Sequence, residues 1–154
     1  MRIVTLAMFV KDGKILLGMK KRGFGVGKWN GYGGKLNEGE SPEQAVVREI
    51  EEESGITVPI KNLNHLGTID FFFIGKPDWD QRGMIYRIDE FEGEAVETEE
   101  MNPRWYSFDE IPYDEMWVDD KYWLPHLLAN ESFTAEFHFD EDGKKIAKHI
   151  VLKQ

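Results

Sequence analysis

One short segment constrains this chain more than any other, because its residues fix both ends of a helix. Ser41 is a favoured N-cap residue, and Pro42 and Glu43 follow it as the proline and acid typical of a first helical turn. Gly55 can adopt the left-handed conformation that commonly ends a helix. These residues predict a helix over about 42–54, inside a loop-helix-loop unit at 34–56.

Three carboxylates project from one face of this predicted helix. Glu49 and Glu53 are four residues apart, and Glu49 and Glu52 three apart. Neighbouring carboxylates repel one another unless a cation binds, and hard oxygen ligands suit Mg²⁺, with Mn²⁺ as a substitute. The alternative is a solvated acidic face, which is the usual role of a glutamate-rich helix. The defined helix ends, together with glycines and Arg48 at fixed offsets, favour a metal site.

The apolar pattern predicts an α/β (α+β) fold. Val46, Val47 and Ile50 lean away from the carboxylates and can pack on a core. Apolar stretches separated by turns predict strands at 3–10, 14–20, 65–74, 84–91, 103–108, 132–139 and 146–152. A second, short helix is expected after Asp119 and Asp120, and the glycine-rich residues 21–33 are expected to form an irregular loop over a binding surface. We therefore expect a mixed β-sheet sandwiched by helices.

Length and charge limit the class of protein. A chain of 154 residues suffices for one core, so we expect a single domain over 1–154. The net charge of −10 argues against a nucleic-acid polymer as the main partner, although a small anionic substrate stays possible. The absence of cysteine excludes disulfides and thiolate metal sites and is consistent with a reducing cytosol.

The apolar start of the chain could suggest a signal peptide, but the polar residues 11–14 interrupt it and no cleavage site follows. No apolar run approaches the length of a membrane span. We expect a cytoplasmic protein without a membrane partner, and we expect it to be a monomer.

Cations and glycines flank the predicted helix unit on its N-terminal side. Lys20, Lys21 and Arg22 form a cluster that could bind a triphosphate, with a solvent-exposed strand end as the alternative. Lys20 is the favoured member, because it lies on the predicted strand. The glycines at 31–34 allow close approach of a ligand, and the Asn30 amide offers both a donor and an acceptor to a base edge.

Aromatic residues and an aspartate pair predict a base pocket. Phe71 and Phe73 share one face of a strand, where core packing is the default, but with Phe24 and Trp117 they could enclose a planar base. Asp119 and Asp120 follow Trp117 and Val118. If one carboxyl stays protonated, the pair offers a donor beside an acceptor. The alternative role is a helix N-cap, and the two roles are compatible.

Residues 34–56 read Gly-x5-Glu-x7-Arg-Glu-apolar-x-Glu-Glu-x-Gly-apolar, which resembles an intact Nudix box. The resemblance to Nudix hydrolases extends from about 5 to 139 and is nearest to the MutT-type oxidised purine nucleoside triphosphatases of animals. It implies the Nudix fold, and metal ligation by Gly33, Glu49, Glu52, Glu53 and Glu100. It implies a substrate site of Thr5, Lys20, Phe24, Asn30, Tyr32, Gly33, Gly34, Lys35, Phe71, Phe73, Trp117, Val118, Asp119 and Asp120.

The resemblance further implies hydrolysis of 8-oxo-dGTP and 2-hydroxy-dATP to the monophosphate and pyrophosphate. Glu49, Glu52 and Glu53 would be catalytic, with Glu52 or Glu53 activating the water, and Arg48 would hold the carboxylates by ion pairing. The segment 76–83 departs from the family and places Gln81 where the family has a methionine, which makes the pocket rim more polar. The alternatives are a Nudix pyrophosphatase for ADP-ribose, dinucleoside polyphosphates or capped RNA, and a non-catalytic nucleotide sensor.

Overall fold

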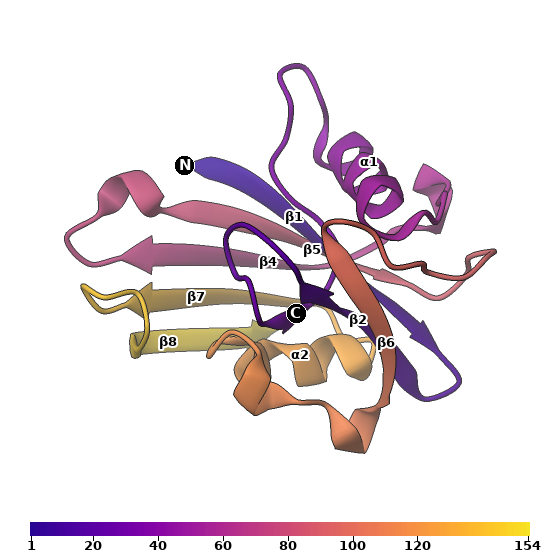
Figure 1. Cartoon of the computed structure of the whole chain (residues 1–154). Helices are drawn as coiled ribbons and strands as arrows, with labels where there is room; N and C mark the ends of the chain where they lie inside the picture. Colours follow the sequence, from indigo (N-terminus) through magenta and orange to yellow (C-terminus); the bar gives the residue numbers. More distant parts are fainter.

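The structure, a computed structural model, describes residues 1–154 and contains one mixed sheet with a helix on each face (Figure 1). The strands are β1 (Arg2–Lys11), β2 (Lys14–Lys20), β3 (Trp29–Asn30), β4 (Asn64–Phe73), β5 (Gln81–Ile88), β6 (Met101–Ser107), β7 (Phe133–Phe139) and β8 (Ile146–Lys153). The helices are α1 (Pro42–Ser54) and α2 (Asp120–Leu128), with short 3-10 turns at Ile60–Asn62, Pro77–Trp79, Phe108–Glu110 and Tyr113–Glu115. Neither α-helix combines the length and apolarity that a membrane span requires.

Hydrogen bonding orders the strands β3-β2-β1-β5-β4-β7-β8, and β6 pairs with β2 outside this path. The β1–β5 and β4–β7 pairs are parallel, whereas all other pairs are antiparallel. The expected mixed sheet between helices is thus confirmed. The strand expected at 84–91 begins earlier, at Gln81, because Gln81 to Gly83 pair with the start of β1. The loop expected at 21–33 contains β3, which pairs with β2.

Residues 31–35, here called the glycine strap, take a place beside β1. The N–H groups of Ala7 and Tyr32 donate to each other's carbonyls at 2.6 and 3.0 Å, and the Thr5 N–H donates to the Gly34 carbonyl at 2.8 Å. β2 pairs with β1 only near their hairpin, so the rest of β1's edge is free to receive the strap. This pairing carries loop backbone to the side of the sheet that α1 covers.

The ends of α1 form as the sequence predicts. The Ser41 side chain accepts from the Gln44 N–H at 3.2 Å, and the Gln44 side chain accepts from the Ser41 N–H at 2.9 Å, which is a capping box. Gly55 has φ of 80° and its N–H donates to the Glu51 carbonyl at 2.9 Å. Local chemistry therefore determines both helix ends.

Two cores lie on opposite faces of the sheet. Val46 and Ile50 of α1 pack with Phe9 and Tyr86 on one face, and α2 packs on the other through Trp123, Leu124 and Leu127. The prediction for Val47 was wrong, because this side chain is only partly buried and lines a shallow depression on the outer side of α1. One residue turns a helix by about 100°, so Val47 cannot share the inner face of Val46 fully.

These positions predict different stabilities for two truncations on the same helix. Ile50→Ala should lower the free energy of unfolding by about 2–5 kcal/mol, because Ile50 is fully buried. Val47→Ala should cost less than about 1 kcal/mol, because its side chain is only partly buried. Urea denaturation followed by circular dichroism measures both. Equal losses in the two variants would contradict the assignment of the inner face.

Candidate active site

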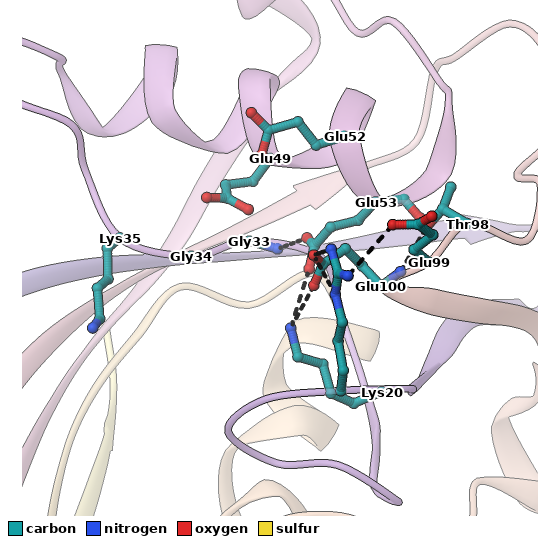
Figure 2. Close-up of a pocket in the computed structure, with 11 residues that line it drawn as sticks. Lys20, Gly33, Gly34, Lys35, Glu49, Glu52, Glu53, Thr98, Glu99 and Glu100 are labelled. Carbon is teal, nitrogen blue, oxygen red and sulfur yellow. Dashed lines mark hydrogen bonds and ion pairs between the residues drawn. The ribbon is translucent and has the colours of Figure 1, made fainter.

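A cavity of about 720 Å³ opens beside α1 and is lined without any hydrophobic residue. Its lining residues are Lys20, Arg22, Gly33, Gly34, Lys35, Glu49, Glu52, Glu53, Thr98, Glu99 and Glu100. Figure 2 shows carboxylates from α1 above the glycine strap, with Lys20 reaching up from β2. Four separate segments of the sequence therefore meet in one strongly charged cavity.

Glu53 is the least exposed of these carboxylates, with 4% of the residue accessible. The Gly33 N–H donates to its Oε1 at 2.9 Å, and Lys20 Nζ lies 3.9 Å from its Oε2. Burial raises the pKa of Glu53 to about 8, and the negative charges of Glu49 and Glu100 act in the same direction. The Gly33 hydrogen bond and Lys20 oppose this shift. A cation near Glu53 would favour its ionised form.

Gly33 in the strap contacts backbone so closely that a side chain cannot be added there, and a side chain at Gly34 would displace Glu49. A Cβ at Gly33 would lie 2.0 Å from the Thr5 carbonyl oxygen, and one at Gly34 would lie 2.7 Å from Glu49 Cδ. Thr5 also bonds the strap through its hydroxyl, 3.2 Å from the Gly34 carbonyl oxygen. No protein hydrogen bond reaches the Gly33 carbonyl oxygen, so it can serve as a ligand.

Arg48 organises the carboxylates of α1. Its guanidinium donates to both oxygens of Glu40 at 2.8 and 3.0 Å, and to Glu49 and Glu52 at 3.0 and 3.2 Å. It also donates to the Lys35 carbonyl at 3.0 Å, which ties the helix to the strap. These contacts match the ion-pairing role that the sequence analysis expects for Arg48.

The carboxylates differ in environment. Burial raises the pKa of Glu49, whereas hydrogen bonding to Arg22 lowers the pKa of Glu100. The Glu52 side chain is 54% exposed. No three of these carboxylates converge on a common point. The donors are nevertheless hard oxygens around an open cavity, with one carbonyl oxygen unbonded, and such a set fits Mg²⁺ or Mn²⁺.

Two of the three clustered cations line the cavity, and the third points away from it. Lys20 lines the cavity and lies 3.5 Å from Glu100. Arg22 also lines the cavity and donates to Glu100 at 2.6 Å. Lys21 turns away to Glu97 and the Thr98 carbonyl, at 2.7 and 2.9 Å. Sequence reasoning did not place Arg22 in the site, although the cluster it belongs to was recognised.

Two further lining residues, Thr98 and Glu99, were also missed, because only their adjacency to Glu100 could have indicated them. Tyr32, expected at the substrate site, is fully buried and does not line the cavity. Its ring packs in the core under α1, because the backbone pairing with β1 turns it inward. Its side chain is therefore part of the core, and a role for Tyr32 at the substrate site stays a prediction.

The aspartate pair lies outside this cavity, at the start of α2. Asp119 and Asp120 are 4% and 2% exposed. Trp123 Nε1 donates to Asp119 Oδ2 at 2.9 Å, whereas Asp120 Oδ2 is buried without a partner. Burial raises the pKa of both carboxyls, and the charge of Asp119 raises that of Asp120 further. Asp119 occupies the N-cap position but makes no capping hydrogen bond, so capping does not explain the pair.

Aromatic rings lie near this pair. Phe24 stacks on Trp117 with ring centroids 5.1 Å apart, and Lys28 Nζ lies 5.2 Å from a Trp117 ring centroid. The charge of Lys28 also favours ionised Asp120. Phe24 and Val118 are 79% and 40% exposed. The segment from Lys20 to Lys28 thus connects the cavity to the aspartate pair.

The remaining predicted pocket residues lie on β3 and β4. Asn30 Oδ1 accepts from the Gly31 N–H at 2.8 Å, while its amide nitrogen makes no protein hydrogen bond. Phe71 and Phe73 both stack on Phe139, at 6.2 and 5.1 Å, and pack against the α2-side core. The shared strand face expected for these two phenylalanines is confirmed. None of the three lines the charged cavity.

Comparison with known proteins places this arrangement in a family. The NUDIX domain matches residues 1–127. The chain is 48% identical over 138 residues to the oxidized purine nucleoside triphosphate hydrolase of Danio rerio, covering 90% of this chain and 86% of that protein. Identity to the enzyme of the same name from Mus musculus is 44% over 140 residues, covering 91% and 88%.

A MutT protein from Bacillus halodurans has a similar solved structure, with a TM-score of 0.83 and 29% identity. The match covers 98% of this chain and 97% of that one. The box carboxylates, the glycine strap and the cationic wall of the cavity all lie within residues 1–127. The chain therefore belongs to the Nudix family.

Proposed function

We propose that this protein hydrolyses oxidised purine nucleoside triphosphates, such as 8-oxo-dGTP and 2-hydroxy-dATP, to the monophosphate and pyrophosphate. The observation that carries the proposal is the cavity in which Glu53 and Glu49 meet Lys20 and Arg22. The two relatives named oxidized purine nucleoside triphosphate hydrolase, at 44–48% identity, support the substrate class.

Each group of the cavity has a role in this proposal. Lys20 binds the phosphates, and Arg48 orients Glu49 and Glu52 through the hydrogen bonds described above. Glu49, Glu52, Glu53, Glu100 and the Gly33 carbonyl would hold Mg²⁺, for which Mn²⁺ can substitute. Such a cation would supply charge shielding for the phosphates, polarisation of phosphorus and a lower pKa for the attacking water. Glu52 or Glu53 would accept the proton of that water as its oxygen bonds to phosphorus and the bond from this phosphorus to the leaving group breaks.

We assign binding of the base to the aromatic residues, Asn30 and the aspartate pair, all of which lie outside the charged cavity. Trp117, Phe24, Phe71 and Phe73 provide apolar walls, and Asn30 offers its free amide nitrogen. The partnerless Asp120 Oδ2 beside Asp119 offers a donor or an acceptor, according to where the proton sits. We further propose that residues 1–154 act as one monomeric, cytoplasmic domain on a small-molecule substrate.

The carboxylate face can be tested by one conservative change. Glu53→Gln keeps the size of the side chain, so the variant should fold, and kcat should fall by about a hundredfold or more.

Pyrophosphate release is measured with 8-oxo-dGTP, 2-hydroxy-dATP, dGTP, dATP and ADP-ribose, with and without Mg²⁺. The wild type should prefer the two oxidised nucleotides and require the cation. A folded variant that keeps half the wild-type kcat would refute the role of Glu53.

Base choice can be tested at the aspartate pair. Asp119→Asn cannot ionise, so the ratio of kcat/KM between 8-oxo-dGTP and 2-hydroxy-dATP should change, since these bases present different edges. A polar contact to a base is worth about 1–3 kcal/mol, or roughly five- to a hundredfold in this ratio. Asp120→Asn is assayed in parallel. A purely structural role predicts instead lower thermal stability and an unchanged ratio in both variants.

The buried carboxylate also predicts a pH dependence of stability. The pKa of Glu53 is raised to about 8, so the folded state binds a proton more tightly than the unfolded chain. In EDTA, stability should therefore fall as the pH rises from the ordinary glutamate pKa towards 8. Glu53→Gln cannot ionise, so it should exceed wild type by about 1–4 kcal/mol at pH 8.5 and match it near pH 4.5. Urea denaturation at both pH values measures the free energies of unfolding. A difference between variant and wild type that is the same at both pH values would contradict the raised pKa of Glu53.

A further inference from the structure

The side chain of Tyr32 presents a polar atom that the fold does not use. The residue is fully buried, and its hydroxyl oxygen has no hydrogen-bond partner. The ring meets Phe9 edge to face at 6.1 Å within the core under α1. A buried hydroxyl without a partner destabilises a fold, and phenylalanine would fill the same space without that cost. An orphaned group of this kind requires an explanation.

The position of Tyr32 connects it to Glu53. The next residue, Gly33, donates its N–H to Glu53 Oε1 at 2.9 Å. On α1, the residues Val46, Ile50 and Glu53 follow one another along the buried face, and the Tyr32 ring packs with Val46 and Ile50. The Tyr32 ring therefore packs against the same buried face of α1 that carries Glu53.

We propose that Tyr32 is a positioning residue for Glu53: once a cation is bound, the ionised Glu53 carboxylate accepts a hydrogen bond from the otherwise unpartnered Tyr32 hydroxyl through one buried water. The inference rests on the proposed function, because it deepens the role of the same site. An ionised carboxylate accepts several hydrogen bonds, so the Gly33 N–H leaves capacity for another donor. A donor behind the carboxylate fixes which lone pairs face the cavity, as the outer partners of metal ligands do.

Tyr86 provides a matched control. It is 1% exposed, belongs to the same core under α1, and donates its hydroxyl to Glu43. Tyr32→Phe and Tyr86→Phe therefore each delete one buried hydroxyl from one core. Only the Tyr32 hydroxyl is proposed to act on the metal site. Comparing the two variants therefore distinguishes an effect on the position of Glu53 from a general effect on core packing.

The experiment measures Mn²⁺ binding by electron paramagnetic resonance, together with kinetics and melting temperature. Tyr32→Phe should weaken Mn²⁺ binding by about 10–100-fold. It should lower kcat while leaving KM within about twofold. In EDTA it should not lower Tm, because without the cation the Tyr32 hydroxyl has no hydrogen-bond partner to lose. Tyr86→Phe should lower Tm by about 2–4 °C, because a satisfied hydrogen bond is lost, and leave Mn²⁺ binding unchanged.

A double variant gives a second measurement. In Glu53→Gln, the Tyr32→Phe change should have no further effect on Mn²⁺ binding, because the carboxylate it positions is already absent. Unchanged Mn²⁺ binding and kcat in Tyr32→Phe, with a raised Tm, would overturn the proposal. So would an equal loss of Mn²⁺ binding in Tyr32→Phe and Tyr86→Phe.

Mn²⁺ binding is measured without nucleotide, so the two proposals fail separately. A wild type that binds Mn²⁺ but leaves 8-oxo-dGTP intact would overturn the proposed substrate. The comparison of Tyr32→Phe with Tyr86→Phe would still decide the role of Tyr32.

Discussion

The burial of one carboxylate between a helix and a strip of glycine backbone determines the architecture of the site. Glu53 is 4% exposed and is held by the Gly33 N–H at 2.9 Å. The contact requires glycine at position 33 of the strap, since a Cβ at Gly33 would collide with the Thr5 carbonyl. It also requires β1 to leave part of its edge free for the strap. The contact between Glu53 and Gly33 therefore depends on three features. These are the glycine pattern, the pairing of β2 with β1 only near their hairpin, and the orientation of α1.

The charges around the cavity follow from this burial. A desolvated carboxylate favours its protonated form, and the nearby acids strengthen that tendency at Glu53. Arg48 on α1 and the Lys20–Arg22 wall supply positive charge to the remaining acids. A chain with a net charge of −10 can thereby present cations where phosphates would bind. The same arrangement leaves Glu53 as the group that gains most from a bound cation.

The sequence predicted what depends on local chemistry. Ser41 and Gly55 define the ends of α1 through hydrogen bonds within a few residues, so the helix and its carboxylate face were predictable. The path of the glycine strap was not, because it depends on where β2 leaves β1. The burial of Tyr32 follows from that path and was missed for the same reason. Arg22 and Thr98 were missed because their places in the cavity arise from contacts across the fold.

The most direct test of the central claim is a crystal structure with Mn²⁺ and a non-hydrolysable analogue of 8-oxo-dGTP, with the cation located by its anomalous signal. The burial of Glu53 against the strap predicts a Mn²⁺ ion within about 2.0–2.3 Å of a Glu53 oxygen, with the Gly33 carbonyl as a further ligand. The phosphates should then lie beside Lys20. A cation bound only on the outer face of α1, with Glu53 making its hydrogen bond to the Gly33 N–H but no contact to the cation, would contradict the role of Glu53 as a metal ligand.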